Sequence, residues 1–493
     1  MLRNPLLSLG AGALLCAALT LAVSAQTPRL PDLGDASAAV VSPQQERRLG
    51  LEAMRELRAA GAYLQDPEVN AYLQALGNRI LVANPELRER FEFFAVADPS
   101  INAFALPGGY IGVHLGLIAL AQSESELAAV LAHEIAHVVQ RHYARSIDEQ
   151  RKNTWMTIAS IAAAAVAARA GSADGVQAAI LAGQAAQIQA ALHFSRENER
   201  EADRVGFNLL ERAHFDTGAM ASLFERLQRA ANLNDPGLLP SYLRTHPLTL
   251  ERLAEARGRV ARSAHAMAVR ESEDFHYVRA LVRSYLGDDR AAVEHFETAL
   301  RDRRFAHEAA TRYGLAAALL RSKQYARGLA VIDEIERSGV RHPMIAALRG
   351  HLLLESGEVS RAIEHFERAS HAWPDHAQFF YDYPEALLRG GRPAEALAVV
   401  ERLLARRGTD TRLLAIAARA AAETGQRLKQ HRYLGEQYVH EGKLQAAIDQ
   451  FELAAKAGDA DHVEASLVEA RRREIKRELE EQAAERRSRW GSR

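Results

Sequence analysis

The residues with the clearest chemical potential are two histidines four positions apart, in His133-Glu134-Ile135-Ala136-His137. On a helix, positions i and i+4 project from one face, so both imidazoles can bind one metal ion. Glu134 lies one position after the first histidine, beside the ion, where a carboxylate can accept a proton from water. The pattern predicts a metal-dependent hydrolase with His133 and His137 as ligands and Glu134 as the catalytic base.

Zinc in a catalytic site takes three protein ligands and leaves a fourth position open. No further histidine follows His137 at the spacing His-x-x-Gly-x-x-His, so a carboxylate from a later helix is the alternative. The segment 195–203 offers three glutamates, Glu197, Glu199 and Glu201. Spacing alone does not choose among them, and on the residues alone a charged helix surface is the favoured interpretation of the segment. If Glu199 binds the ion, Asp203 lies on the same face and can anchor a ligand histidine through its second nitrogen.

The elements around this motif point to a mixed domain with little sheet. Amphipathic helices are expected at 43–60 and 67–83, and short strands between 91 and 113, broken at Pro107-Gly108-Gly109. Ser123 and Glu126 have the spacing of a capping box at the start of the histidine helix. The strand after the turn could offer a free edge to an extended substrate, or it could simply pair inside the core. The edge interpretation uses Gly108, Gly109, Tyr110 and Ile111.

Four other histidines lie near these motifs. His246, in Thr245-His246-Pro247, is held in extended backbone by the following proline. One hypothesis is that it stabilises an oxyanion, or occupies the open metal position and gates the enzyme. The alternative is that it only caps the helix that begins near residue 248. The other three are expected to be ordinary structural or surface residues: His114, His142 and His193.

From about residue 270 to 457 the sequence repeats with a period of 34 residues, as between Gly357 and Gly391. Four glycines mark the repeat: Gly287, Gly357, Gly391 and Gly442. Each is followed five residues later by an alanine: Ala292, Ala362, Ala396 and Ala447. Phenylalanine comes four residues after three of these alanines. This pattern resembles tetratricopeptide repeats and predicts an all-α solenoid with a groove for peptides or partner proteins.

Three motifs together identify the family that the N-terminal half resembles. They are residues 102–111 (NAFALPGGYI), His133-Glu-Ile-Ala-His137, and Glu199-x-x-Ala202-Asp203. The combination looks like the gluzincin metallopeptidases of the CAAX prenyl protease and HtpX type. In that family the first glutamate of Glu-x-x-Ala-Asp is the third zinc ligand, so the resemblance implies Glu199 and one Zn²⁺ per chain. A signal peptide and repeats make the whole chain similar to the periplasmic, BepA-like branch.

The chain divides into five predicted segments. These are a signal peptide at 1–25, a flexible leader at 26–42, a zinc metallopeptidase domain at 43–265, the repeats at 270–457, and a charged C-terminal capping helix and tail at 458–493. A lipoprotein is disfavoured because Leu15 precedes the only cysteine, Cys16, and a retained anchor because the apolar run barely reaches spanning length. The low-charge stretch 153–194 is interpreted as a hairpin that docks on a neighbouring domain or makes peripheral contact with a membrane surface.

The expected fold is mainly α (α+β): a zincin-type domain with a small sheet, followed by the solenoid. A net charge of −1 disfavours nucleic acid as a partner. The resemblance implies a periplasmic zinc endopeptidase with a chaperone role, acting on unfolded or misassembled outer-membrane proteins. The repeat groove would bind them or the outer-membrane β-barrel assembly machinery. The alternative is a latent or non-proteolytic chaperone or scaffold, which would have no need for Glu134.

Overall fold

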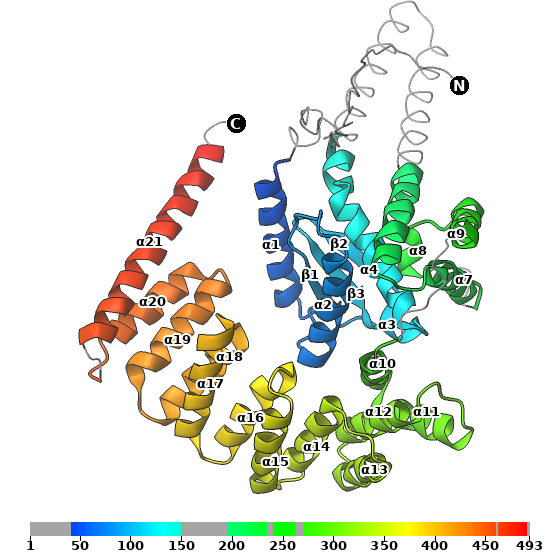
Figure 1. Ribbon diagram of the computed structural model, residues 1–493. Coiled ribbons are helices and arrows are strands. Elements are labelled where there is room, and N and C mark those ends of the chain that lie inside the picture. Colours follow the sequence, from blue (N-terminus) through cyan, green and yellow to red (C-terminus); the bar gives the residue numbers. More distant parts are fainter. Residues whose placement is uncertain (1–40, 149–194, 234–239, 263–270, 460–461, 491–493) are drawn as a thin grey trace, which may run out of the picture.

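The computed structural model describes residues 41–148, 195–233, 240–262, 271–459 and 462–490 (Figure 1). The predicted signal peptide, nearly all of the leader, the hairpin at 153–194 and the domain boundary near 265–270 lie outside these ranges. In the described part, helices predominate and one small sheet is present, followed by helical repeats, which confirms the predicted fold class. No helix in these ranges is both long enough and apolar enough to cross a membrane.

The first part of the fold surrounds a three-stranded sheet. Its first elements are α1 (Pro43–Ala59), α2 (Pro67–Val82), β1 (Glu92–Val96), β2 (Ala103–Leu106), β3 (Tyr110–His114), α3 (Leu115–Leu120) and α4 (Glu124–Val139). Helical residues 142–148 and 195–212 follow, then α7 (Gly218–Leu233), α8 (Ser241–Thr245) and α9 (Leu250–Arg262). Local signals set several starts, as at α2, where the Asp66 carboxylate accepts a hydrogen bond from Val69 N and Pro67 is the first helical residue.

The strand order corrects the predicted substrate edge. The sheet runs β1-β3-β2, with β1 parallel and β2 antiparallel to β3. Ile111 is paired with Phe93 on one side and Ala105 on the other, so β3 has no free edge. Gly108 and Gly109 form the turn before β3 with positive φ angles of 81° and 89°. Strand pairing on both sides therefore accounts for Tyr110 and Ile111, and the turn accounts for Gly108 and Gly109.

The capping box at the start of α4 forms only in part. Ser123 Oγ accepts a hydrogen bond from Glu126 N at 3.0 Å, as expected. The Glu126 carboxylate does not return to Ser123. It accepts from Gln122 N at 2.8 Å and pairs with Arg226 of α7 instead. The start of the histidine helix is thus tied to α7 as well as capped.

The repeats form pairs of antiparallel helices. They are α10 (Glu273–Tyr285), α11 (Asp289–Arg301), α12 (Glu308–Arg321), α13 (Tyr325–Arg337), α14 (Pro343–Glu355), α15 (Val359–Ala372), α16 (Ala377–Arg389), α17 (Pro393–Arg407), α18 (Thr411–Glu423), α19 (Arg427–His440) and α20 (Leu444–Ala455). Phe366, one of the repeated phenylalanines, packs against the neighbouring helix α14. A Cβ added at Gly350 would lie 2.3 Å from the ring of Phe366, so only glycine lets these helices approach so closely. The charged helix α21 (His462–Trp490) follows and buries Val468 and Ile475.

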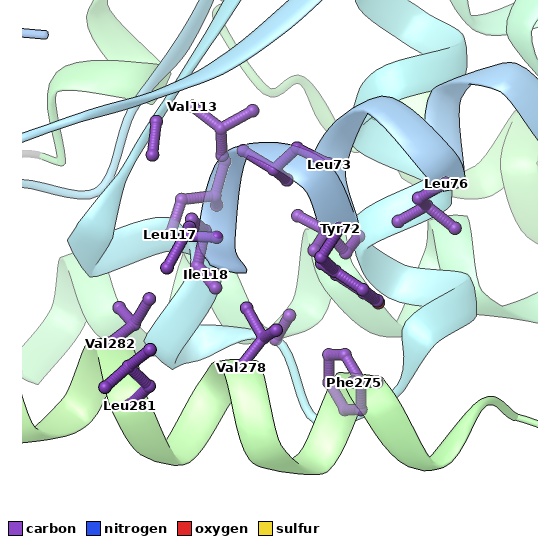
Figure 2. Close-up of a cluster of buried hydrophobic side chains, with 14 of the residues drawn as sticks. Tyr72, Leu73, Leu76, Val113, Leu117, Ile118, Phe275, Val278, Leu281 and Val282 are labelled. Atoms are coloured by element: carbon purple, nitrogen blue, oxygen red, sulfur yellow. The ribbon is translucent and has the colours of Figure 1, made fainter. Parts of the chain in front are cut away.

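The sheet domain and the first repeats share one hydrophobic core. Figure 2 shows Phe275 and Val278 of α10 facing Tyr72 of α2 and Ile118 of α3. Phe275 and Val278 are almost completely buried there. Further along the solenoid, α16 packs against α2, and the His376 ring nitrogen lies 3.0 Å from the Glu68 carboxylate. The first repeat helix is therefore part of the core that supports the sheet (Figure 1).

Candidate metal centre

The candidate site lies where α4 meets the helix 195–212. Both helices are buried on their facing sides, and they approach closely at Gly206, where an added Cβ would lie 3.1 Å from His133 N. His133 and His137 project from α4 toward this contact, and Glu199 projects from the other helix. A small residue at the crossing thus lets a carboxylate from a distant segment reach the pair of imidazoles.

The structure brings the three predicted ligand side chains together. His133 Nε2 lies 3.0 Å from His137 Nε2. The Glu199 carboxylate lies 3.5 Å from the first of these nitrogens and 3.4 Å from the second. His133 and Glu199 are buried, and the His137 side chain is only 15% exposed. Of the three candidate glutamates, Glu199 is the one that faces both histidines.

His246 joins the same cluster. Its Nδ1 lies 3.1 Å from Glu199 Oε1 and 3.3 Å from His133 Nε2. The ring of Tyr242 packs beside it, with the ring centres 4.6 Å apart. The alternative role as a helix cap is filled by Thr249, whose hydroxyl accepts a hydrogen bond from Arg252 N at the start of α9. His246 therefore faces the ligand cluster, as one of the two hypotheses requires.

These side chains fit a divalent metal ion. One atom from each of His133, His137, Glu199 and His246 lies within 4.8 Å of the others. Three imidazole nitrogens that face one point cannot all donate to one another, whereas a cation there accepts a lone pair from each. Two imidazoles and a carboxylate are the ligand set of many catalytic zinc sites. Beside them, Glu134 Oε1 is buried, lies 3.5 Å from His246 Nε2 and has no hydrogen-bond partner among the described residues.

Asp203 and Arg252 support His133 from behind. Asp203 Oδ1 lies 3.0 Å from His133 Nδ1, the nitrogen that faces away from the cluster. Arg252 donates two hydrogen bonds to Asp203, of 2.7 and 2.8 Å, and lies 3.0 Å from Glu199. It also donates to Pro247 O, next to His246. The sequence interpretation included Asp203 but missed Arg252, whose only signal was its place among the charges of an amphipathic helix.

His142 stands behind His137 in a similar way. The two Nδ1 atoms lie 2.8 Å apart, and His142 Nε2 lies 3.2 Å from Glu201 Oε2. Arg145 contacts the same carboxylate oxygen at 2.7 Å. His142 was expected to be an ordinary structural or surface residue. The structure instead places it in contact with a predicted ligand, while His193 lies outside the described residues.

The buried charges shift one another's pKa values. Burial disfavours the charged form of His133, but the neighbouring carboxylates of Asp203 and Glu199 raise its pKa to about 10. Burial also opposes ionisation of Glu199, yet its bonds to His133 and His246 lower its pKa. Burial raises the pKa of Glu134, against the positive charges of His246 and His133. A raised pKa brings a carboxylate closer to neutral pH, where a general base works best.

The outer strands of the sheet are β1 and β2. The outer side of β1 is bonded to the side chains of α2, so the free edge belongs to β2, which packs against α4. His114 N donates to Asn102 O, and pairing alternates along antiparallel strands, so the backbone groups of Ala105 point away from β3. Within the described residues, those groups have no hydrogen-bond partner. An extended chain could add to the sheet here, beside the helix that carries the histidines.

Comparison with known proteins agrees with this geometry. The model of peptidase family M48 matches residues 67–260, and a tetratricopeptide-repeat model matches residues 277–339 and 348–411. A Vibrio cholerae protein, named provisionally as a beta-barrel assembly-enhancing protease, is 38% identical over 62% of this chain and 63% of its own length.

Two further relatives extend the comparison. The beta-barrel assembly-enhancing protease of Escherichia coli (strain K12) is 30% identical over 85% of both chains. The mitochondrial metalloendopeptidase OMA1 of Schizosaccharomyces pombe is 31% identical over 43% of this chain and 60% of its own. The chain is thus a metallopeptidase that belongs to family M48, among the beta-barrel assembly-enhancing proteases.

Proposed function

We propose that the protein is a zinc endopeptidase in which His133, His137 and Glu199 hold the ion. The observation that carries this proposal is the convergence of two imidazoles from α4 and one carboxylate from the helix 195–212 on a common point. Zinc bound there would supply Lewis acidity, which makes water nucleophilic near neutral pH and polarises a peptide carbonyl. Asp203, fixed by Arg252, orients His133 for this task.

The chain's own groups would do the rest of the chemistry. Glu134 takes a proton from the attacking water and passes it to the leaving amine. The outer edge of β2 at Ala105 receives the substrate as an added strand, through main-chain hydrogen bonds. Recognition of this kind favours unfolded or extended chains over a particular sequence. The edge of β2 thus takes the role that the sequence analysis gave to β3, and the proposed preference for unfolded substrates is unchanged.

The biological setting also belongs to the proposal. The relatives' names support a protease that acts in β-barrel assembly, and its substrates would be unfolded or misassembled outer-membrane proteins. After removal of the signal peptide 1–25, it would work in the periplasm. The repeats would bind these substrates or the outer-membrane β-barrel assembly machinery, and add a chaperone role. The segment 153–194 could make peripheral contact with the membrane surface.

The direct test is cleavage of unfolded casein by the purified protein, with and without a zinc chelator. We expect cleavage that stops in the chelator and returns when zinc is added in slight excess. Bound metal measured on the same samples should fall and rise in parallel. Cleavage that continues after the metal is removed would contradict the zinc mechanism, and absence of cleavage with metal bound would favour the scaffold alternative.

One observation favours a gated enzyme. With His246 in the cluster, four ligand atoms lie within 4.8 Å of one another, so a zinc ion held by all four would have no open position for water. We therefore expect His246→Ala to raise the rate of casein cleavage while the protein keeps its bound zinc. A fall in rate would instead support the oxyanion role. An unchanged rate would leave His246 with neither function.

A further inference from the structure

His137 is held from behind by a chain of polar contacts that runs back to the helix 195–212. Its Nδ1 lies 2.8 Å from His142 Nδ1, whose ring is buried, and His142 Nε2 lies 3.2 Å from Glu201 Oε2. Arg145 lies 2.7 Å from that oxygen. The chain His137–His142–Glu201–Arg145 therefore continues from the cluster toward the surface.

These polar contacts determine which ring nitrogens of His137 and His142 carry hydrogen. The Nε2 of His137 faces the cluster, so it must be unprotonated to bind a metal, and its hydrogen must sit on Nδ1. His137 Nδ1 then donates to His142 Nδ1, which must accept. The hydrogen of His142 is consequently on Nε2, where it donates to the Glu201 carboxylate. Only this arrangement satisfies both contacts with neutral imidazoles.

We propose that His142 is a positioning residue that fixes the tautomer and ring orientation of His137 and so sets the affinity of the site for zinc. The proposal rests on the proposed zinc function. Three residues of the helix 195–212 would then act on a bound ion. Glu199 would bind it directly, Asp203 would orient His133, and Glu201 would orient His137 through His142. Partners of this kind typically change metal affinity by about 10- to 100-fold.

The backbone turn at Arg141 places His142 beside His137. Arg141 has a positive φ of 52°, which ends α4 and turns the chain into the helical residues 142–148. His142 follows at once, so the turn swings its ring back toward His137, five positions earlier. Its partner Glu201 is 59 residues away in sequence. The contact between His142 and Glu201 is thus a tertiary one, and the turn at Arg141 positions His142 for it.

The test uses three variants of the full chain that separate the two hydrogen bonds. Asparagine places its amide oxygen where the imidazole has Nδ1, so His142→Asn can still accept from His137. Glutamine places its amide nitrogen where the imidazole has Nε2, so His142→Gln can still donate to Glu201. His142→Phe keeps the ring and loses both bonds. Zinc affinity is measured by competition with a chromophoric chelator, and site geometry by the visible spectrum of the cobalt form.

We expect His142→Phe and His142→Gln to weaken zinc binding by about 10- to 100-fold, and His142→Asn to retain most of the affinity. The cobalt spectrum should change in the first two. Equal affinity in all three variants, or tighter binding by Gln than by Asn, overturns the proposal. The comparison of Asn with Gln holds even if one variant lowers the melting temperature of the metal-free protein, because both lose the ring.

A matched control is His114→Phe. His114 is also buried in this domain and hydrogen-bonded, with Nδ1 2.9 Å from Ser100 Oγ, but it has no contact with the cluster. The zinc affinity of the His114→Phe protein should equal that of the wild type. If the wild-type protein itself binds no zinc, the proposed function fails. If it binds zinc and the His142 variants bind equally well, only this inference fails.

Discussion

Glu134→Gln should reduce casein cleavage by about 10²- to 10⁴-fold while zinc affinity stays close to the wild-type value. The amide has nearly the shape of the carboxylate but cannot accept the water proton. Glu134 Oε1 is buried and has no hydrogen-bond partner among the described residues, but it lies 3.5 Å from His246 Nε2, so at that atom the substitution removes only this ion pair. Cleavage rates and bound metal should be measured on the same preparation.

The metal measurement makes this prediction specific. Glu199→Gln, on the facing helix, should lower both cleavage and zinc affinity, because the carboxylate lies within 3.5 Å of both imidazoles. A Glu134→Gln protein that has lost its zinc would place Glu134 among the ligands. One that has full metal and full activity would remove it from the mechanism and return the scaffold alternative to first place.

Arg252→Met should lower the free energy of unfolding of the metal-free protein by about 3–5 kcal/mol. The arginine is only 3% exposed and forms a two-bond pair with Asp203 at 2.7 and 2.8 Å. Methionine fills similar volume but removes two hydrogen bonds from the buried carboxylate of Asp203 and a permanent positive charge from beside Glu199. Unfolding in urea, followed by circular dichroism, measures the loss.

Arg419→Met is the matched comparison for this loss. Arg419 also bonds one carboxylate, that of Glu385, at 2.8 and 3.0 Å, but its side chain is 54% exposed. Water replaces such a pair at little cost, so the change should be at most about 1 kcal/mol. Equal losses for the two arginines would mean that burial of the Asp203 pair does not matter to stability.

Local patterns were enough to predict most of the fold. Helix starts such as Asp66-Pro67 need only neighbouring residues, and the repeat spacing repeats the same contact several times along the chain. Two histidines four positions apart on a helix need no tertiary information either. These features were readable because the interacting atoms lie within a turn or two of one another.

The features that sequence reasoning missed depend on contacts between distant segments. Arg252 meets Asp203 across 49 residues, and in sequence it looks like any charge on an amphipathic helix. His142 contacts Glu201, which is 59 residues further along the chain. Glu199 itself was chosen by resemblance to a family, since three glutamates fit the spacing equally well. The partner that each of these side chains contacts is set by the tertiary fold, which local sequence patterns do not show.

The sheet edge was wrong for a related reason. The residues Gly108–Ile111 were correctly placed at a turn and the start of a strand, but strand order is set by packing. The parallel pairing of β1 with β3 leaves β2 outside, although β2 comes between them in the chain. No local pattern in β3 distinguishes a central strand from an outer one, because strand order depends on which distant strands pair with it.

The apolar contact between α10 and the helices α2 and α3 limits how this protein can be taken apart. In a catalytic fragment ending at residue 262, the apolar surfaces of Tyr72 and Ile118 would be exposed to water. In the full chain, Phe275 and Val278 of α10 cover them. Such a fragment should aggregate unless α10 is retained with it. Engineers who graft other repeat arrays onto this enzyme should therefore make the junction after Tyr285, and treat α10 as belonging to the catalytic half.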